Sequence, residues 1–185
     1  TSDARASLAA MCLFDDIVEH GGPDEAAKYS PILLQGAMVV MSDPSKFERD
    51  LVQAAVYGVA QMSRYAPSNV LSDSNTLQTL VHQLLAITKG NKEDAGDGVY
   101  LFEIAVSALA SLVLFGPFAD AKFVNKPAVQ DAFLKSLPLQ EDEDEAKICH
   151  AGLCHLVEKG AIDLQAEGPR IFRIAGSILA DIQEG

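Results

Sequence analysis

The stretch that decides the fold is QAAVYGVAQMSRYAP, residues 53–67. Read together with Leu51, its apolar residues recur every three or four positions, which is the period of a helix buried along one face. Gly58 lies inside this pattern, where glycine costs about 1 kcal/mol relative to alanine. We therefore expect the backbone of another helix to pass very close to Gly58. The helix should end at Ala66, because Pro67 disfavours helical dihedral angles in the residue before it.

The same pattern is repeated along the chain. Four times an apolar residue precedes a glycine or alanine by seven positions, and the copies are about 44–50 residues apart. A repeat of about 40–47 residues made of paired helices is typical of HEAT and armadillo arrays. The sequence therefore predicts an all-α fold, a HEAT-repeat superhelix (solenoid) of about four helix pairs that forms a single array over residues 1–185. The pairs are Phe14 and Gly21, Val59 and Ala66, Leu109 and Gly116, and Leu153 and Gly160.

The period of the apolar residues and the residues typical of helix starts and ends predict eight helices. Ser45 and Glu48 match a capping box ahead of the third helix, and Pro169 suits the first turn of the last. Leu13 and Phe172 are expected to face inward, and the almost wholly apolar fifth helix is expected to be the most buried. A polar insert at 90–97 lengthens the third unit. The expected helices are 3–20, 25–41, the helix containing 53–66, 75–89, 98–115, 127–136, 141–159 and a helix from 169 onward.

Composition and charge restrict the possible functions. A hydrophobic content of 49% with 22% charged residues indicates a folded protein with a core. The net charge of −12 argues against nucleic-acid binding, and it favours basic protein partners or simply solubility. The longest charge-free run, residues 104–119, is too short to span a membrane, and the first residues do not resemble a signal peptide. Three cysteines are too few for a disulfide framework, which favours a reducing compartment.

No residue pattern predicts an enzyme, a cofactor or a metal site. The Cys-His pairs at 149–150 and 154–155 place only two of their four side chains on one helix face, whereas structural zinc needs four ligands. Asp15 and Asp16 diverge by about 100° around a helix, with no serine or histidine positioned to work with them. The acidic run at 141–145 either is a solvated helix start, favoured by the helix dipole, or contacts a basic partner.

Four segments carry a family resemblance. They are AMCLFDDIVEHGGPDEAAKYSPILL (10–34), QAAVYGVAQMSRYA (53–66), SLPLQEDEDEAKICHAGLCHLVEKG (136–160) and GPRIFRIAGSIL (168–179). In this order they resemble the last HEAT repeats of the karyopherin-β (importin-β) nuclear import receptors, and in particular the beta-3 branch of that family. Because the chain starts inside a helical pattern and without methionine, we expect a fragment of a longer receptor.

The resemblance implies a function and a set of site residues. Receptors of this family shuttle between cytoplasm and nucleus, carry basic cargo such as ribosomal proteins and histones past nucleoporins, and respond to Ran in its GTP state. The implied fragment is a non-enzymatic monomer that binds neither nucleic acid nor membranes. In such receptors the second helix of each repeat lines the concave surface, which implies that acidic residues of the first, third, fifth and seventh helices face a partner. The candidates are Asp15, Asp16, Glu19, Glu103 and Glu143.

Two other classes of protein fit the same residues. A HEAT scaffold, such as a phosphatase regulatory subunit, also has acidic ridges on its concave face. An enzyme could also carry an accessory helical domain of this type. Further beta-3-like repeats upstream would favour the receptor, and activity in a hydrolase or transferase screen would favour the enzyme.

Overall fold

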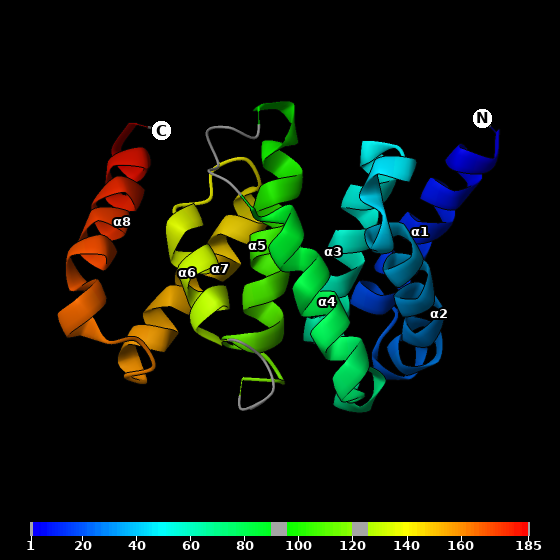
Figure 1. Cartoon of the computed structure of the whole chain (residues 1–185), viewed down its shortest axis with the longest axis horizontal. Coiled ribbons are helices and arrows are strands. Elements are labelled where there is room, and N and C mark those ends of the chain that lie inside the picture. Colours follow the sequence, from blue (N-terminus) through cyan, green and yellow to red (C-terminus); the bar gives the residue numbers. More distant parts are fainter. Residues whose placement is uncertain (1, 90–95, 120–125, 185) are drawn as a thin grey trace.

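The computed structural model describes residues 2–89, 96–119 and 126–184, and within these ranges it is all-helical, with no strand (Figure 1). The predicted all-α class is confirmed, whereas most of the predicted polar insert lies outside the described residues. The α-helices are α1 (Ser2–His20), α2 (Pro23–Ser42), α3 (Arg49–Tyr65), α4 (Ser74–Ile87), α5 (Val99–Val113), α6 (Lys126–Ser136), α7 (Glu143–Glu158) and α8 (Leu164–Glu184). Short 3-10 turns are η1 (Pro44–Lys46), η2 (Ser68–Leu71) and η4 (Gly96–Gly98).

The helices follow one another across the molecule in chain order, so the two termini lie at opposite ends (Figure 1). α1, α3, α5 and α7 form one row, in which each packs on the next. α2 packs on α1 and α3, while α4 and α6 pack on α5. Acidic side chains on the row of odd-numbered helices are therefore brought to neighbouring positions, although they are far apart in the sequence.

The core is divided between the two sides of α5. Its residues from Phe102 to Val113 are all buried, as the apolar sequence predicts. Leu109 and Leu112 belong to a cluster shared with α1 to α4, whereas Val106 belongs to a second cluster with α6, α7 and α8. α5 thus connects the two halves of the molecule.

Two predicted helix starts are wrong. Ser45 lies in η1, where its hydroxyl donates to Asp43 Oδ1 at 2.6 Å. Glu48 is itself the N-cap of α3 and makes no capping bond through its side chain, so no capping box forms. α8 starts at Leu164, one turn earlier than expected, because the Asp163 carboxylate accepts the backbone N–H of Gln165 at 2.9 Å.

The first and last helices, α1 and α8, expose apolar side chains. Leu13 on α1 is 57% exposed and Phe172 on α8 is 81% exposed, so both predictions of an inward side chain are wrong. The buried stripe of α8 instead includes Ile174. The apolar surface of α1 and α8 is wider than the surface that their neighbours cover.

Gly58 has the close neighbours that its sequence position predicts, but they are side chains and not helix backbone. A Cβ at this position would lie 2.5 Å from Asp15 Oδ1 of α1 and 3.1 Å from Leu33 Cδ1 of α2. α1 and α2 therefore both pack against α3 at Gly58.

Gly58→Leu is expected to lower the free energy of unfolding by about 1–3 kcal/mol, because the new side chain must displace Asp15 and Leu33. Thermal unfolding followed by circular dichroism measures the change. Gly176→Leu is the control, since a Cβ there meets no atom within 4 Å. A melting temperature equal to that of wild type would mean that α3 is not packed as described.

Candidate functional site

A hollow of about 480 Å³ lies between α1, α3, α5 and the beginning of α7. We call it the acidic groove. Among the residues that the structure describes, no Lys, Arg or His lines it. Two tyrosines, Tyr57 and Tyr100, are part of its wall. Its acidic lining residues are Asp15, Asp16, Asp50, Asp142, Asp144 and Glu145.

Asp15, a predicted site residue, lines the acidic groove but is only 3% exposed. Its Oδ1 is buried and has no hydrogen-bond partner among the described residues. Burial, followed by the nearby charges of Asp16 and Glu19, raises the pKa of Asp15 to about 8. The carboxyl therefore holds its proton at neutral pH, and the groove is less negative than its sequence alone implies.

Two predicted neighbours of Asp15 have different surroundings. Asp16 is exposed and lines the acidic groove, so it is available to a partner. Glu19 is half-buried and accepts a hydrogen bond from the Tyr57 hydroxyl at 3.0 Å. Burial and the charge of Glu19 raise the pKa of Tyr57, which keeps the phenol a donor. Glu19 therefore joins α1 to α3 beside the groove.

Glu103 does not face a partner, contrary to the sequence-based expectation. It is fully buried, and its carboxylate accepts the backbone N–H groups of Gln140 and Glu141 at distances of 2.8–3.1 Å. These bonds offset the cost of burying a charge and hold the segment that leads into α7. Helix class alone placed Glu103 on the concave side, but the α6–α7 connection covers it.

The acidic start of α7 is partly structural and partly exposed. The Asp142 side chain caps the helix by accepting the N–H groups of Asp144 and Glu145, each at 3.1 Å. Asp142 also accepts the Tyr100 hydroxyl at 2.9 Å, which ties α7 to α5. Glu143, a predicted site residue, is exposed beside the acidic groove but does not line it.

Sequence reasoning missed a buried ionic cluster below the groove. Arg64 of α3 donates to both carboxylate oxygens of Glu145, at 2.9 Å and 2.5 Å. The same guanidinium donates to the Ser107 hydroxyl at 2.9 Å and to Ser111 at 3.1 Å. Glu145 is 2% exposed and also accepts the Ser107 hydroxyl. We call these four residues the Arg64 cluster.

A signal for this cluster was present in the sequence. Glu103, Ser107 and Ser111 recur every four residues in the otherwise apolar α5, so they share one helix face. Polar residues on one face of a buried helix require partners. The partners of Ser107 and Ser111 lie on α3 and α7, and those of Glu103 lie in the α6–α7 connection. Only the tertiary structure brings these segments together.

Among the described residues, no group of three or more His, Cys, Asp or Glu could hold a metal ion. Cys149 is buried, whereas Cys154 and His155 are exposed. Burial raises the pKa of Cys149 to about 12, so its thiol stays protonated. Over the same ranges, no helix is both long and apolar enough to cross a membrane.

No protein-family model and no solved structure matches this chain.

Proposed function

We propose that this chain is the C-terminal portion of a karyopherin-β nuclear import receptor of the beta-3 (importin-5) type. In this proposal it is a HEAT solenoid that shuttles between cytoplasm and nucleus and helps to carry basic cargo past nucleoporins under the control of Ran-GTP. The support comes from the four resembling segments, the repeat spacing and the acidic groove. It is a binding function and needs no catalytic residue.

The acidic groove is the observation that supports a basic partner most directly. It carries carboxylates from α1, α3 and α7 around one hollow, and no basic residue lines it within the described ranges. Asp16, Asp50 and Asp144 are exposed there. A lysine or arginine side chain entering the groove would meet several of these carboxylates together with the hydroxyls of Tyr57 and Tyr100.

Exposed apolar side chains on the first helix pair and on α8 support a longer array. Leu13, Ile32 and Val39 of the first helix pair are each more than half exposed, as are Phe172 and Leu179 of α8. In solenoids each repeat buries its apolar faces against the neighbouring repeats. Further repeats stacked on either end would cover these residues.

A Lys-rich peptide is expected to bind the acidic groove with an affinity that falls as salt rises. Asp16→Lys and Asp144→Lys should each weaken binding about tenfold, since each replaces an attractive charge in the lining by a repulsive one. Fluorescence anisotropy with a labelled peptide measures the affinity. Asp24→Lys is the matched control, because Asp24 is exposed in the first turn of α2 and outside the groove.

Two results would count against the proposed basic partner. One is the absence of saturable binding to the wild-type chain. The other is an equal loss in the control, which would indicate attraction by net charge alone. Glu143→Lys further separates binding in the groove from attraction by nearby charge, because Glu143 is exposed next to the groove without lining it. Its effect should be smaller than that of Asp144→Lys.

A HEAT scaffold or regulatory subunit that does not take part in transport is the alternative. The same paired helices and the same groove would serve it, so peptide binding does not separate the two. Depletion of the parent protein does: accumulation of a basic reporter in the nucleus should fall for a receptor and stay unchanged for a scaffold.

A further inference from the structure

A second groove, opposite in charge to the acidic groove, lies between the end of α6 and α8. It consists of two adjoining hollows of about 400 Å³ and 370 Å³, which share Lys135, Leu137, Pro138 and Ser177 in their lining. Hollows of this volume are within the range of small-ligand pockets. We call them together the basic groove.

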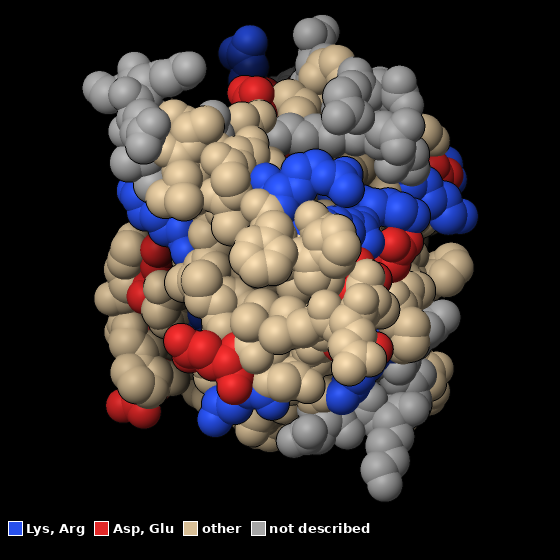
Figure 2. All heavy atoms as spheres, turned by 90° about the vertical axis from the view of Figure 1, so that its left-hand side faces the viewer, with Lys and Arg blue, Asp and Glu red and all other residues tan. Residues whose placement is uncertain are grey.

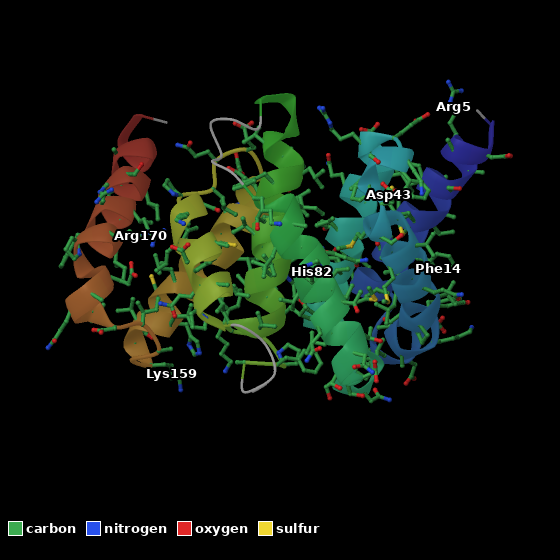
Figure 3. All side chains as sticks on the ribbon, in the orientation of Figure 1. Arg5, Phe14, Asp43, His82, Lys159 and Arg170 are labelled. Atoms are coloured by element: carbon green, nitrogen blue, oxygen red, sulfur yellow. The ribbon has the colours of Figure 1, made fainter. Side chains whose placement is uncertain are left out.

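Among the described residues, every charged residue in the lining of the basic groove is a cation. These cations are Lys135 of α6 and Arg170 and Arg173 of α8, in a chain whose net charge is −12. Figure 2 shows Lys and Arg atoms running as a band across the α8 end of the molecule, with uncharged surface below the middle of the band and Asp and Glu atoms next to its right-hand part. Figure 3 shows Arg170 on the side of α8 that faces α6. Positive charge is therefore gathered here against the overall balance of the protein.

Two of the cations are partly compensated. Lys135 Nζ lies 2.6 Å from Asp131 Oδ2, and Arg170 Nη1 makes long contacts of 3.4 Å with Asp131 Oδ1 and 3.3 Å with Glu167 Oε2. Arg173 is exposed and makes no ion pair or hydrogen bond within the described ranges. Arg173 therefore offers an unused planar guanidinium, a donor group that matches the geometry of a carboxylate.

The rest of the lining mixes apolar and polar groups. Leu134, Leu137 and Ile174 form an apolar floor that is largely covered by their own neighbours. Ser177 lies one turn beyond Arg173 and Ile174 on the same side of α8, and its hydroxyl makes no hydrogen bond among the described residues. A ligand in this groove would therefore meet cations at the rim and aliphatic carbon below them.

We propose that the basic groove docks an acidic peptide segment of a partner protein, with carboxylates on Arg173, Arg170 and Ser177 and an aliphatic side chain on the floor formed with Ile174. Charge complementarity favours this occupant, because the charged residues that line the groove within the described part of the chain are Lys135, Arg170 and Arg173. A nucleic acid or an anionic membrane presents a wide polyanionic surface, which the surrounding net charge of −12 would repel. A short peptide meets only the local positive charge. This docking site is separate from the acidic groove and does not depend on the proposed cargo.

The test is a fluorescence-anisotropy titration of the whole chain with a short labelled peptide of Glu and Leu. Saturable binding that weakens with salt is expected, and Arg173→Glu should reduce the affinity about tenfold or more. Ser177→Ala should give a smaller loss. The matched control is Lys159→Glu, an equal change of charge at an exposed lysine at the end of α7, outside the groove (Figure 3).

Three outcomes would overturn the proposal. These are no saturable binding to the wild-type chain, an equal loss in Arg173→Glu and Lys159→Glu, and tighter binding to anionic vesicles or a DNA oligonucleotide than to the peptide. Arg173 is exposed, so its variant should keep the wild-type melting temperature and its affinity for the Lys-rich peptide. That second affinity separates a failure of the basic groove from a failure of the acidic groove.

Discussion

Arg64→Met is expected to lower the free energy of unfolding by about 3–5 kcal/mol, because it leaves the Glu145 carboxylate buried without its cation. Arg64 is the donor that connects α3 to α5 and α7, through Glu145, Ser107 and Ser111. Its loss removes these bonds together. Chemical denaturation followed by circular dichroism measures the change in stability.

A double-mutant cycle separates the interaction from the cost of an unpaired charge. Glu145→Met alone leaves Arg64 unpaired, whereas Arg64→Met with Glu145→Met removes both charges and should recover much of the lost stability. Lys147→Met is the matched control, because Lys147 pairs with Asp144 at the surface, where solvent screening makes an ion pair contribute little to stability. A loss for Arg64→Met no larger than that of the control would contradict the buried pair.

Asp15→Asn is expected to stabilise the protein at pH 8 by about 5 kcal/mol and to have little effect at pH 4. The pKa of Asp15 is raised from 3.8 to about 8 in the fold, chiefly by burial. Between these values the unfolded chain releases a proton that the folded protein keeps, so wild-type stability falls as pH rises through this window. Asparagine has no proton to lose, and the gap between variant and wild type should therefore widen from pH 4 to pH 8.

Thermal unfolding over this pH range measures the effect of Asp15→Asn. Other acids near Asp15 also titrate, so Asp16→Asn is the control: it removes a charge from the same groove at an exposed position. Parallel pH profiles for the two variants would contradict a protonated Asp15. The titratable side chains that line the groove with Asp15 or shift its pKa are Cys12, Asp16 and Glu19 of α1, Asp50 and Tyr57 of α3, Tyr100 of α5, and Asp142, Asp144 and Glu145 of α7.

The helical content could be predicted because it follows from local properties. The period of the apolar residues and the positions of prolines and glycines predicted eight helices. Most of the predicted ends lie within a few residues of those observed. The exceptions depended on competing side-chain bonds. Ser45 bonds to Asp43 and does not cap α3, and Asp163 starts α8 one turn before Pro169. A sequence pattern identifies a possible cap, but the actual cap depends on where the chain turns.

The candidate site could be predicted only in part. The expectation that the second helix of each repeat lines the concave surface identified acidic residues on α1, α5 and α7. That expectation gives the side of the solenoid on which a residue lies, but not how deeply its side chain is buried. Asp16 and Glu143 are exposed, as a binding residue must be, whereas Glu103 is covered by the α6–α7 connection. Asp50, which lines the groove from α3, was not predicted, because its carboxylate has no distinguishing local pattern.

The sequence by itself determined that this chain is helical, rich in carboxylates and close-packed around Gly58, since period, composition and the absence of a side chain are local properties. The tertiary structure decided what each charge does. It paired Arg64 with Glu145 across 81 positions of sequence, buried Asp15 against α3 and gathered Arg170, Arg173 and Lys135 around one groove. The physical reason is that the free energy of a charge depends on its solvation and its neighbours, and both are set by distant parts of the chain.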